Sequence, residues 1–304
     1  MTRSQSELGR RVTGRIWTVL LALVATTTCT PTSPPTEEDP AMTSTSRHFF
    51  ASSLGAVHYV DAGPREGAPL VLLHQTPRSI DEYRDVIPVL AAERRVVAVD
   101  MPGYGCSDVP DHQPSVEEYA DTVVALLDHL GIPEAVFVGH HTGAILSIDI
   151  AARHPRRVNR LVLSGPFYMD AEAREMLHGI SEQWRVRPDG SHIREKWDKF
   201  SGWTDDPAIV QRVVTDLLRA GETSEYGHFA CAEYRMEETL PLVEAPSLLI
   251  IGRSDQFANH PKNAIFADAL PGVELAILDG GVFLPAESPG AFAEAVLAYL
   301  DGQG

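Results

Sequence analysis

Short continuous apolar runs alternate with longer amphipathic segments, and this alternation most constrains the fold. A strand that lacks polar alternation is buried on both faces, as in a parallel sheet covered by helices. The runs are PLVLLHQ (69–75), RRVVAVD (94–100), AVFVG (135–139), RLVLSG (160–165), SLLIIG (247–252) and VELAILD (273–279). Buried strands separated by helices predict an α/β fold with a mostly parallel sheet and helices on both faces.

The segments between the runs contain the expected helices and one hairpin. Helical spacing of apolar residues covers residues 81–92, 116–130, 142–154 and 289–300. Ser115 is the predicted N-cap of the second helix, and Glu118 completes a capping box. Two β-rich pieces flank Leu54-Gly55, which predicts a hairpin before the first buried strand.

The interval between residues 165 and 247 contains several helical patterns but no apolar strand run. A helical insertion at the C-terminal edge of a parallel sheet lies over the edge where such sheets bind ligands. We therefore expect a helical cap at about residues 167–244. It carries Trp184, Trp197 and Trp203, and we expect most of them in the cap's own core and one or two facing a pocket.

Residues 1–45 differ from the rest of the chain. Arg10, Arg11 and Arg15 precede IWTVLLALVA, an apolar run too short to span a bilayer but typical of an export signal. The Thr/Pro/Ser-rich stretch that follows is typical of a flexible linker. This pattern predicts an exported or cell-envelope protein, whereas translation from Met42 would give a cytoplasmic one. In both cases the folded domain spans residues 46–302, with no stable membrane span.

Charge and cysteine content restrict the partners. The chain has 25 basic and 42 acidic residues, a formal net charge of -17. Such a surface repels phosphate backbones and anionic lipid, so a small-molecule substrate is expected and nucleic acid is not. Cys29, Cys106 and Cys231 lack metal-ligand spacing, and their odd number argues against a disulfide framework. Neither a metal nor a cofactor is expected, and the sequence leaves the oligomeric state open.

Three motifs in order resemble the α/β-hydrolase fold superfamily in its capped branch. HQTPRS (74–79) is similar to the H-G-x-P-x-S turn that supplies part of an oxyanion hole. VVAVDMPGYGCSD (96–108) is similar to the D-x-P-G-x-G-x-S loop. VFVGHHTGAI (136–145) is similar to the nucleophile elbow, which lies between a strand and a helix. The resemblance covers roughly residues 47–302. It implies an eight-stranded sheet with a helical cap inserted late in the sheet.

The sequence departs from this family at the residues that carry its chemistry. His141 stands where the family has a nucleophilic Ser, Asp or Cys. Val282, in the segment GVF, stands where the family has its base histidine. Asp255 stands at the family's acid position, so the resemblance implies that one triad member is kept.

The oxyanion turn also departs, with Gln75 in place of the usual glycine. The resemblance implies one N–H donor from Thr142 and a second from Gln75 or Thr76. Such donors stabilise negative charge that develops on a carbonyl oxygen. The Gln75 side chain would add a further donor if it faces the substrate, and would otherwise fill space.

An imidazole at the elbow can relocate the base. It is longer than a serine side chain, so His141 could reach the space left by Val282 and hydrogen-bond Asp255. The helix N-terminus and burial favour the neutral ring, whereas a nearby carboxylate favours the charged one. We expect His141 to act as general base toward water or a substrate C–H. Direct attack on an acyl group is the alternative.

The remaining histidines have weaker claims. His140 is expected to pack beneath the turn, with a catalytic role less expected than a structural one. His260 could pair with Asp255 and replace the missing base. His192 and His228 lie in the predicted cap, where a histidine is more often solvated or in the core than catalytic.

The pattern predicts a cofactor-free enzyme that acts on a small carbonyl compound. Hydrolysis of an ester or lactone competes with lyase or proton-transfer chemistry, because the fold alone does not select a reaction. The alternative is a catalytically inactive binding protein that kept the pocket and lost the triad. The two differ in whether His141 lies within hydrogen-bond reach of Asp255 and lines a cavity.

Overall fold

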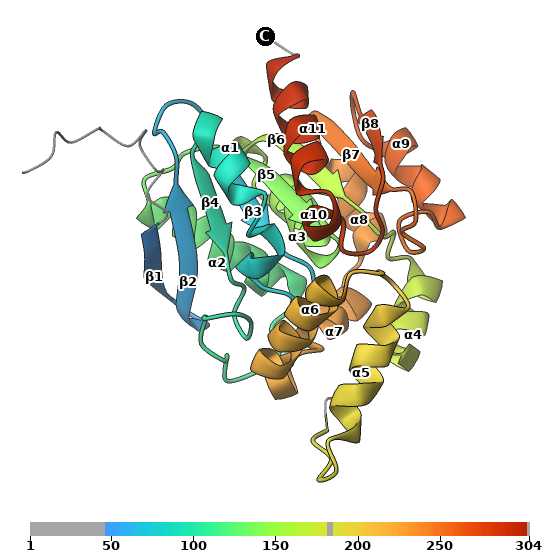
Figure 1. Cartoon of the computed structure of the whole chain (residues 1–304). Coiled ribbons are helices and arrows are strands. Elements are labelled where there is room, and N and C mark those ends of the chain that lie inside the picture. Colours follow the sequence, from blue (N-terminus) through green and yellow to red (C-terminus); the bar gives the residue numbers. More distant parts are fainter. Residues whose placement is uncertain (1–45, 181–184, 303–304) are drawn as a thin grey trace, which may run out of the picture. The chain divides into compact units, whose positions relative to one another are not determined.

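The computed structural model describes residues 46–180 and 185–302 (Figure 1). The predicted export signal, the linker and Trp184 lie outside the described residues. No helix among those described is both long enough and apolar enough to cross a bilayer.

Strands from the described ranges form one eight-stranded sheet in the order β1-β2-β4-β3-β5-β6-β7-β8. The strands are β1 (Ser46–Ser52), β2 (Gly55–Ala62), β3 (Leu70–Leu73), β4 (Val96–Val99), β5 (Ala135–His140), β6 (Val158–Ser164), β7 (Ser247–Gly252) and β8 (Glu274–Leu278). β1 and β2 form the predicted hairpin, and β2 pairs antiparallel with β4. All other neighbours are parallel, which confirms the mostly parallel sheet.

Helices cover both faces of this sheet (Figure 1). Leu70 and Leu72 of β3 pack with α1 and α11 in one apolar cluster, while Val71 and Leu73 pack with α2 and α3 in another. The α-helices outside the cap are α1 (Ile87–Glu93), α2 (Val116–His129), α3 (Thr142–Arg153), α9 (Ile265–Ala269), α10 (Leu284–Glu287) and α11 (Pro289–Asp301). The short 3₁₀ helices are η1 (Ile80–Tyr83), η2 (Pro155–Arg157), η3 (Gly221–Thr223), η4 (Leu240–Leu242) and η5 (Pro261–Ala264).

The start of α2 was correctly predicted. The Ser115 side chain accepts a hydrogen bond from the Glu118 N–H, and the Glu118 carboxylate accepts one from the Ser115 N–H. This capping box pairs backbone donors that a helix start leaves without an internal partner.

Two expectations need correction. The single helix predicted for residues 81–92 is two elements, η1 and α1, with a break between Tyr83 and Ile87. Pro88 lies in the first turn of α1, where its missing N–H costs nothing, whereas inside one continuous helix it would break a bond. The run at 273–279 is a strand but not a buried one. β8 is a sheet edge, and Leu275 and Ile277 are 63% and 52% exposed.

In the described ranges, five α-helices lie between β6 and β7, where a cap was expected (Figure 1). They are α4 (Ala171–Ile180), α5 (Ser191–Ser201), α6 (Pro207–Ala220), α7 (Tyr226–Glu233) and α8 (Met236–Thr239). Residues of α5 and α6 share an apolar cluster with Val282 and Phe283, and Trp197 and Trp203 pack against it. The cap helices therefore lie against the C-terminal loop that ends the sheet.

Candidate functional site

His141 occupies a sharp corner between β5 and α3. Its backbone has φ 47° and ψ -108°, and it is the one non-glycine residue with positive φ in the described ranges. Such a conformation costs about 1–3 kcal/mol and persists where the surroundings impose it. Glycines flank the corner because there is no room for a side chain. A Cβ on Gly139 would lie 2.2 Å from the Gly143 carbonyl oxygen, and one on Gly143 would lie 2.0 Å from that of Leu73.

The corner directs the His141 ring onto Asp255. His141 Nε2 lies 2.8 Å from Asp255 Oδ2, and Asp255 is only 1% exposed. The other carboxylate oxygen, Oδ1, accepts the backbone N–H groups of Phe257 and Ala258 at 2.9 and 3.0 Å. Since Nε2 is engaged, Nδ1 is the ring nitrogen that remains, and no described residue hydrogen-bonds to it.

Each member of this pair shifts the pKa of the other. Burial raises the pKa of Asp255, but the charge and hydrogen bond of His141 outweigh it, and the pKa is about 2. Burial disfavours a charged His141, yet the Asp255 carboxylate outweighs burial and raises the pKa of His141 above 6.5. The sequence left open whether the helix N-terminus and burial, or a nearby carboxylate, would decide the charge of the His141 ring. The carboxylate of Asp255 has the larger effect.

His140 lies fully buried beneath the corner and ties two segments together. Its Nδ1 lies 2.9 Å from Ser164 Oγ, and its Nε2 lies 3.0 Å from the Val282 carbonyl oxygen. A carbonyl only accepts, so Nε2 carries the proton and Nδ1 accepts from the serine hydroxyl. Burial lowers the pKa of His140 to about 4, which keeps the ring neutral at neutral pH. His140 therefore holds the loop after β8 against the elbow.

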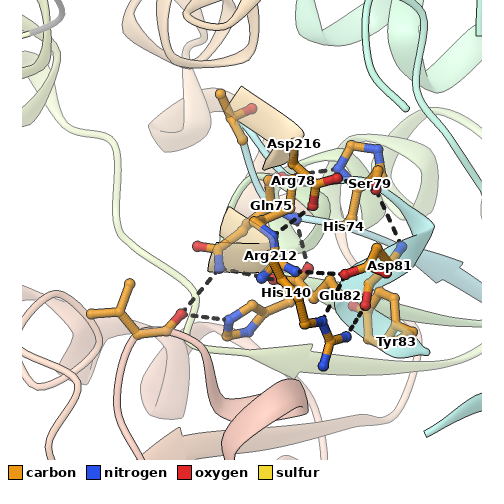
Figure 2. Close-up of polar contacts among 12 residues, drawn as sticks. His74, Gln75, Arg78, Ser79, Asp81, Glu82, Tyr83, His140, Arg212 and Asp216 are labelled. Carbon is orange, nitrogen blue, oxygen red and sulfur yellow. Dashed lines mark hydrogen bonds and ion pairs between the residues drawn. The ribbon is translucent and has the colours of Figure 1, made fainter. Parts of the chain in front are cut away.

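The hydrogen-bond donors of Gln75, which were expected to face an oxyanion or the substrate, are used within the protein. Its N–H donates to Glu82 Oε2 at 2.9 Å, and its amide Nε2 donates to Glu82 Oε1 at 2.8 Å and to the Val282 carbonyl at 3.1 Å. Figure 2 shows Gln75 and His140 meeting at one carbonyl oxygen. Gln75 lines the cavity, but its donors serve a buried carboxylate and a loop rather than a substrate.

Thr76 and Thr142 are the other two residues expected to donate to an oxyanion. The Thr76 N–H donates to Thr142 Oγ1 at 3.3 Å, a long and weak hydrogen bond that a substrate oxygen can displace. The Thr142 N–H is in the first turn of α3, where helix N–H groups have no partner within the helix. Two N–H groups from different segments thus meet beside His141.

A cavity of about 460 Å³ opens over this corner. His141, Thr76 and Thr142 line one side of it. Its apolar lining comes from the cap and from the loops after β6 and β7, and includes Phe167, Met169, Phe200, Trp203 and Phe257. Trp203 thus faces the cavity, while Trp197 packs in the cap cluster. A cavity of this size with a mostly apolar surface suits a small, largely apolar molecule.

A family model described as alpha/beta hydrolase fold matches residues 68–289. The chain belongs to the α/β-hydrolase fold family.

Several relatives in this family are enzymes of known activity. The chain is 29% identical over 249 residues to 2-hydroxymuconate semialdehyde hydrolase from Pseudomonas sp. (strain CF600), covering 77% of this chain and 87% of the relative. It is 23% identical over 251 residues to 3-oxoadipate enol-lactonase 2 of Acinetobacter baylyi, covering 81% and 93%. A solved hydrolase from Pseudomonas aeruginosa PA01 has a TM-score of 0.71 at 25% identity, covering 84% and 98%.

In this α/β-hydrolase, His260 lies apart from the His141–Asp255 pair. It is exposed, its Nδ1 accepts from the Lys262 N–H at 3.4 Å, and its ring packs against Phe167. The side chain that reaches Asp255 is His141 rather than His260. His260 was one possible replacement for the missing base, but in the described structure Asp255 pairs with His141 instead.

One group in the described ranges has three side chains with metal-ligating atoms within 4.8 Å of one another: His58, Asp100 and Cys106. Asp100 Oδ2 already takes part in hydrogen bonds with His58 Nδ1 and the Cys106 N–H, at 2.7 and 2.8 Å. Its Oδ1 accepts the Ile80 N–H at 2.7 Å. This carboxylate organises the loop after β4, and the cluster does not extend to the cavity.

The sequence interpretation missed a second histidine in the cavity. His228, at the start of α7, lines the cavity, and its Nδ1 lies 2.7 Å from Glu225 Oε2. The sequence signal for this pair was the spacing of Glu225 and His228, because residues three positions apart lie on the same side of a helical turn and can form a hydrogen bond.

Proposed function

We propose that this protein is a cofactor-free hydrolase that cleaves an ester or lactone, with His141 as general base. The observation that carries the proposal is the 2.8 Å contact between His141 Nε2 and Asp255 in the wall of the cavity. A neutral ring that donates Nε2–H to the carboxylate has its lone pair on Nδ1. That lone pair is available to take a proton from a water molecule.

The reaction follows from this arrangement. As Nδ1 removes a proton, the water oxygen forms a bond to the carbonyl carbon, and the carbonyl electron pair moves onto its oxygen. The N–H groups of Thr142 and Thr76 stabilise that oxyanion. The bond to the leaving oxygen then breaks, and a proton reaches that oxygen to give an alcohol and a carboxylic acid.

A base role suits His141 better than a nucleophilic one. A nucleophile at this corner would need a second base to deprotonate the water that cleaves the acyl intermediate. In the described part of the chain, His141 has one ionisable hydrogen-bond partner, Asp255, which has a pKa of about 2 and is a poor base. The names of two relatives, a semialdehyde hydrolase and an enol-lactonase, also support hydrolysis of small carbonyl compounds.

The test is hydrolysis of a panel of nitrophenyl esters and lactones by wild type and His141→Ala. General-base catalysis is worth about 10²–10⁴-fold, so we expect a loss of at least about 10²-fold in kcat. His178→Ala is the matched control, because His178 pairs with Glu233 on the exposed side of the cap. Equal rates for wild type and His141→Ala would remove His141 from the mechanism.

A binding protein without activity is the second candidate, and one observation favours it. The N–H groups of Gln75 and Thr76 both donate to protein acceptors, so the oxyanion site is partly occupied by the protein itself. This candidate predicts that ligands bind in the cavity without turnover, and that His141→Ala binds and reacts as wild type does. Lyase or proton-transfer chemistry on Nδ1 predicts turnover that depends on His141 but yields no acid product.

A further inference from the structure

A second histidine–carboxylate pair faces the same cavity from the cap. His228 Nδ1 lies 2.7 Å from Glu225 Oε2, and both residues line the cavity together with His141. The Glu225 side chain is 12% exposed and that of His228 is 32% exposed. Nδ1 is engaged by the carboxylate, and no described residue hydrogen-bonds to Nε2.

The packing of α7 places this pair beside the oxyanion donors. The Gly227 N–H donates to the Tyr104 hydroxyl at 2.7 Å, and a Cβ on Gly227 would lie 2.0 Å from Thr76 Oγ1. One turn later, the Cys231 thiol is hydrogen-bonded to the Thr142 side chain. The first turn of α7 therefore rests on the two threonines, and His228 follows Gly227 directly in the chain.

We propose that His228, held by Glu225, is the proton donor to the leaving group. This inference rests on the proposed function. His141 Nδ1 takes a proton from water, and His228 Nε2–H gives one to the leaving oxygen, which keeps the electron pair of the broken C–O bond. Solvent then removes the proton from His141 and returns one to His228. The net reaction is ester plus water to acid plus alcohol.

The carboxylate beside His228 suits a ring that donates a proton. Burial raises the pKa of Glu225, but the hydrogen bond and charge of His228 outweigh it and lower that pKa, so the carboxylate is ionised beside the ring. A carboxylate on Nδ1 holds the ring proton and orients Nε2. The base and the acid are then separate side chains, so water can lose a proton at His141 while the leaving oxygen gains one from His228.

The other titratable groups of the cavity leave Glu225 as the nearest negative charge. From α5, Lys196 and Lys199 favour the ionised form of Glu225, and Glu195 pairs with Arg187. From the turn after β3, Arg78 pairs with Asp216. Burial raises the pKa of the Cys231 thiol to about 12, so it is neutral. The remaining group is His141, which pairs with Asp255.

The experiment compares two esters of one acid, a 4-nitrophenyl ester and an alkyl ester. Nitrophenolate leaves without a proton, whereas an alkoxide needs one. We expect His228→Gln to lower kcat for the alkyl ester by about 10²-fold or more and to leave the nitrophenyl ester nearly unchanged.

Glu225→Gln keeps the shape of the side chain and removes its charge, so we expect a smaller loss on the alkyl ester and again almost none on the nitrophenyl ester. His178→Gln is the matched control, because it alters a cap histidine–glutamate pair that does not line the cavity. Equal losses on both esters would overturn this inference while leaving the proposed function intact. A wild-type protein that hydrolyses neither ester overturns both.

Discussion

Replacing Asp255 with asparagine tests the link between the buried pair and the base. Asp255 Oδ1 accepts two backbone N–H groups, so an asparagine would keep its oxygen there. Its NH₂ group would then take the place of Oδ2 and donate to His141 Nε2. A ring that accepts at Nε2 carries its proton on Nδ1. Asp255→Asn therefore removes both the negative charge and the lone pair that faces the cavity.

The magnitude follows from the pKa of Asp255, which falls from 3.8 to about 2 in the folded protein. That change corresponds to about 2 kcal/mol of net interaction in favour of the ionised carboxylate, and His141 is its principal partner. If that interaction stabilises the imidazolium formed as water is deprotonated, its loss slows the reaction by about 30-fold. The tautomer change adds to this figure.

The assay is the pH dependence of kcat/KM for the most reactive ester of the panel. The base must be neutral, and the pKa of His141 is raised, so the wild-type rate should rise with pH through a midpoint above 6.5. In Asp255→Asn, burial acts on His141 without the opposing carboxylate, and any residual activity should rise at lower pH. A variant with wild-type kcat/KM and an unshifted midpoint would refute the coupling of the two residues.

Three further changes test how the site is held. Gly227→Ala places a Cβ 2.0 Å from Thr76 Oγ1, so α7 or the Thr76 side chain must move, and we expect a loss of kcat of about 10²-fold, measured with the same ester. Asp216→Ala removes the closest acid from the fully buried Arg78 and should cost about 3 kcal/mol of unfolding free energy in urea titrations. Ser115→Ala removes the N-cap of α2 and should cost about 1 kcal/mol by the same measurement, without changing kcat; a larger kcat effect would contradict a purely local role.

Much of the fold follows from local pattern. The fully apolar runs became β3, β4 and β5, buried on both faces, because an apolar strand needs cover on each side. β8 comes from a similar run that also contains Glu274, but it is an edge strand, and strand order depends on long-range contacts that a local pattern does not encode. The break at Pro88 was visible in the sequence, but the helical spacing of apolar residues continued across it.

The site could be predicted only where a motif fixed the backbone. The elbow motif places His141 at a corner, and the segment after β7 places Asp255 opposite it. The partner of Gln75 could not be predicted, because Glu82 lies in a polar stretch that is typical of an exposed helix face but is fully buried. His228 reaches the cavity only through the packing of the cap; its spacing from Glu225 was visible in the sequence, but the surface that the pair faces was not.

The loop after β8 is anchored through its main chain. Gln75 and His140 both donate to the Val282 carbonyl, an atom that every amino acid possesses. The Val282 side chain takes no part in these two hydrogen bonds; it packs in the apolar cluster with α5 and α6 and lines the cavity. A substitution at this position can therefore change the chemistry offered to the cavity while both hydrogen bonds to the loop remain, provided that the new side chain fits the cluster.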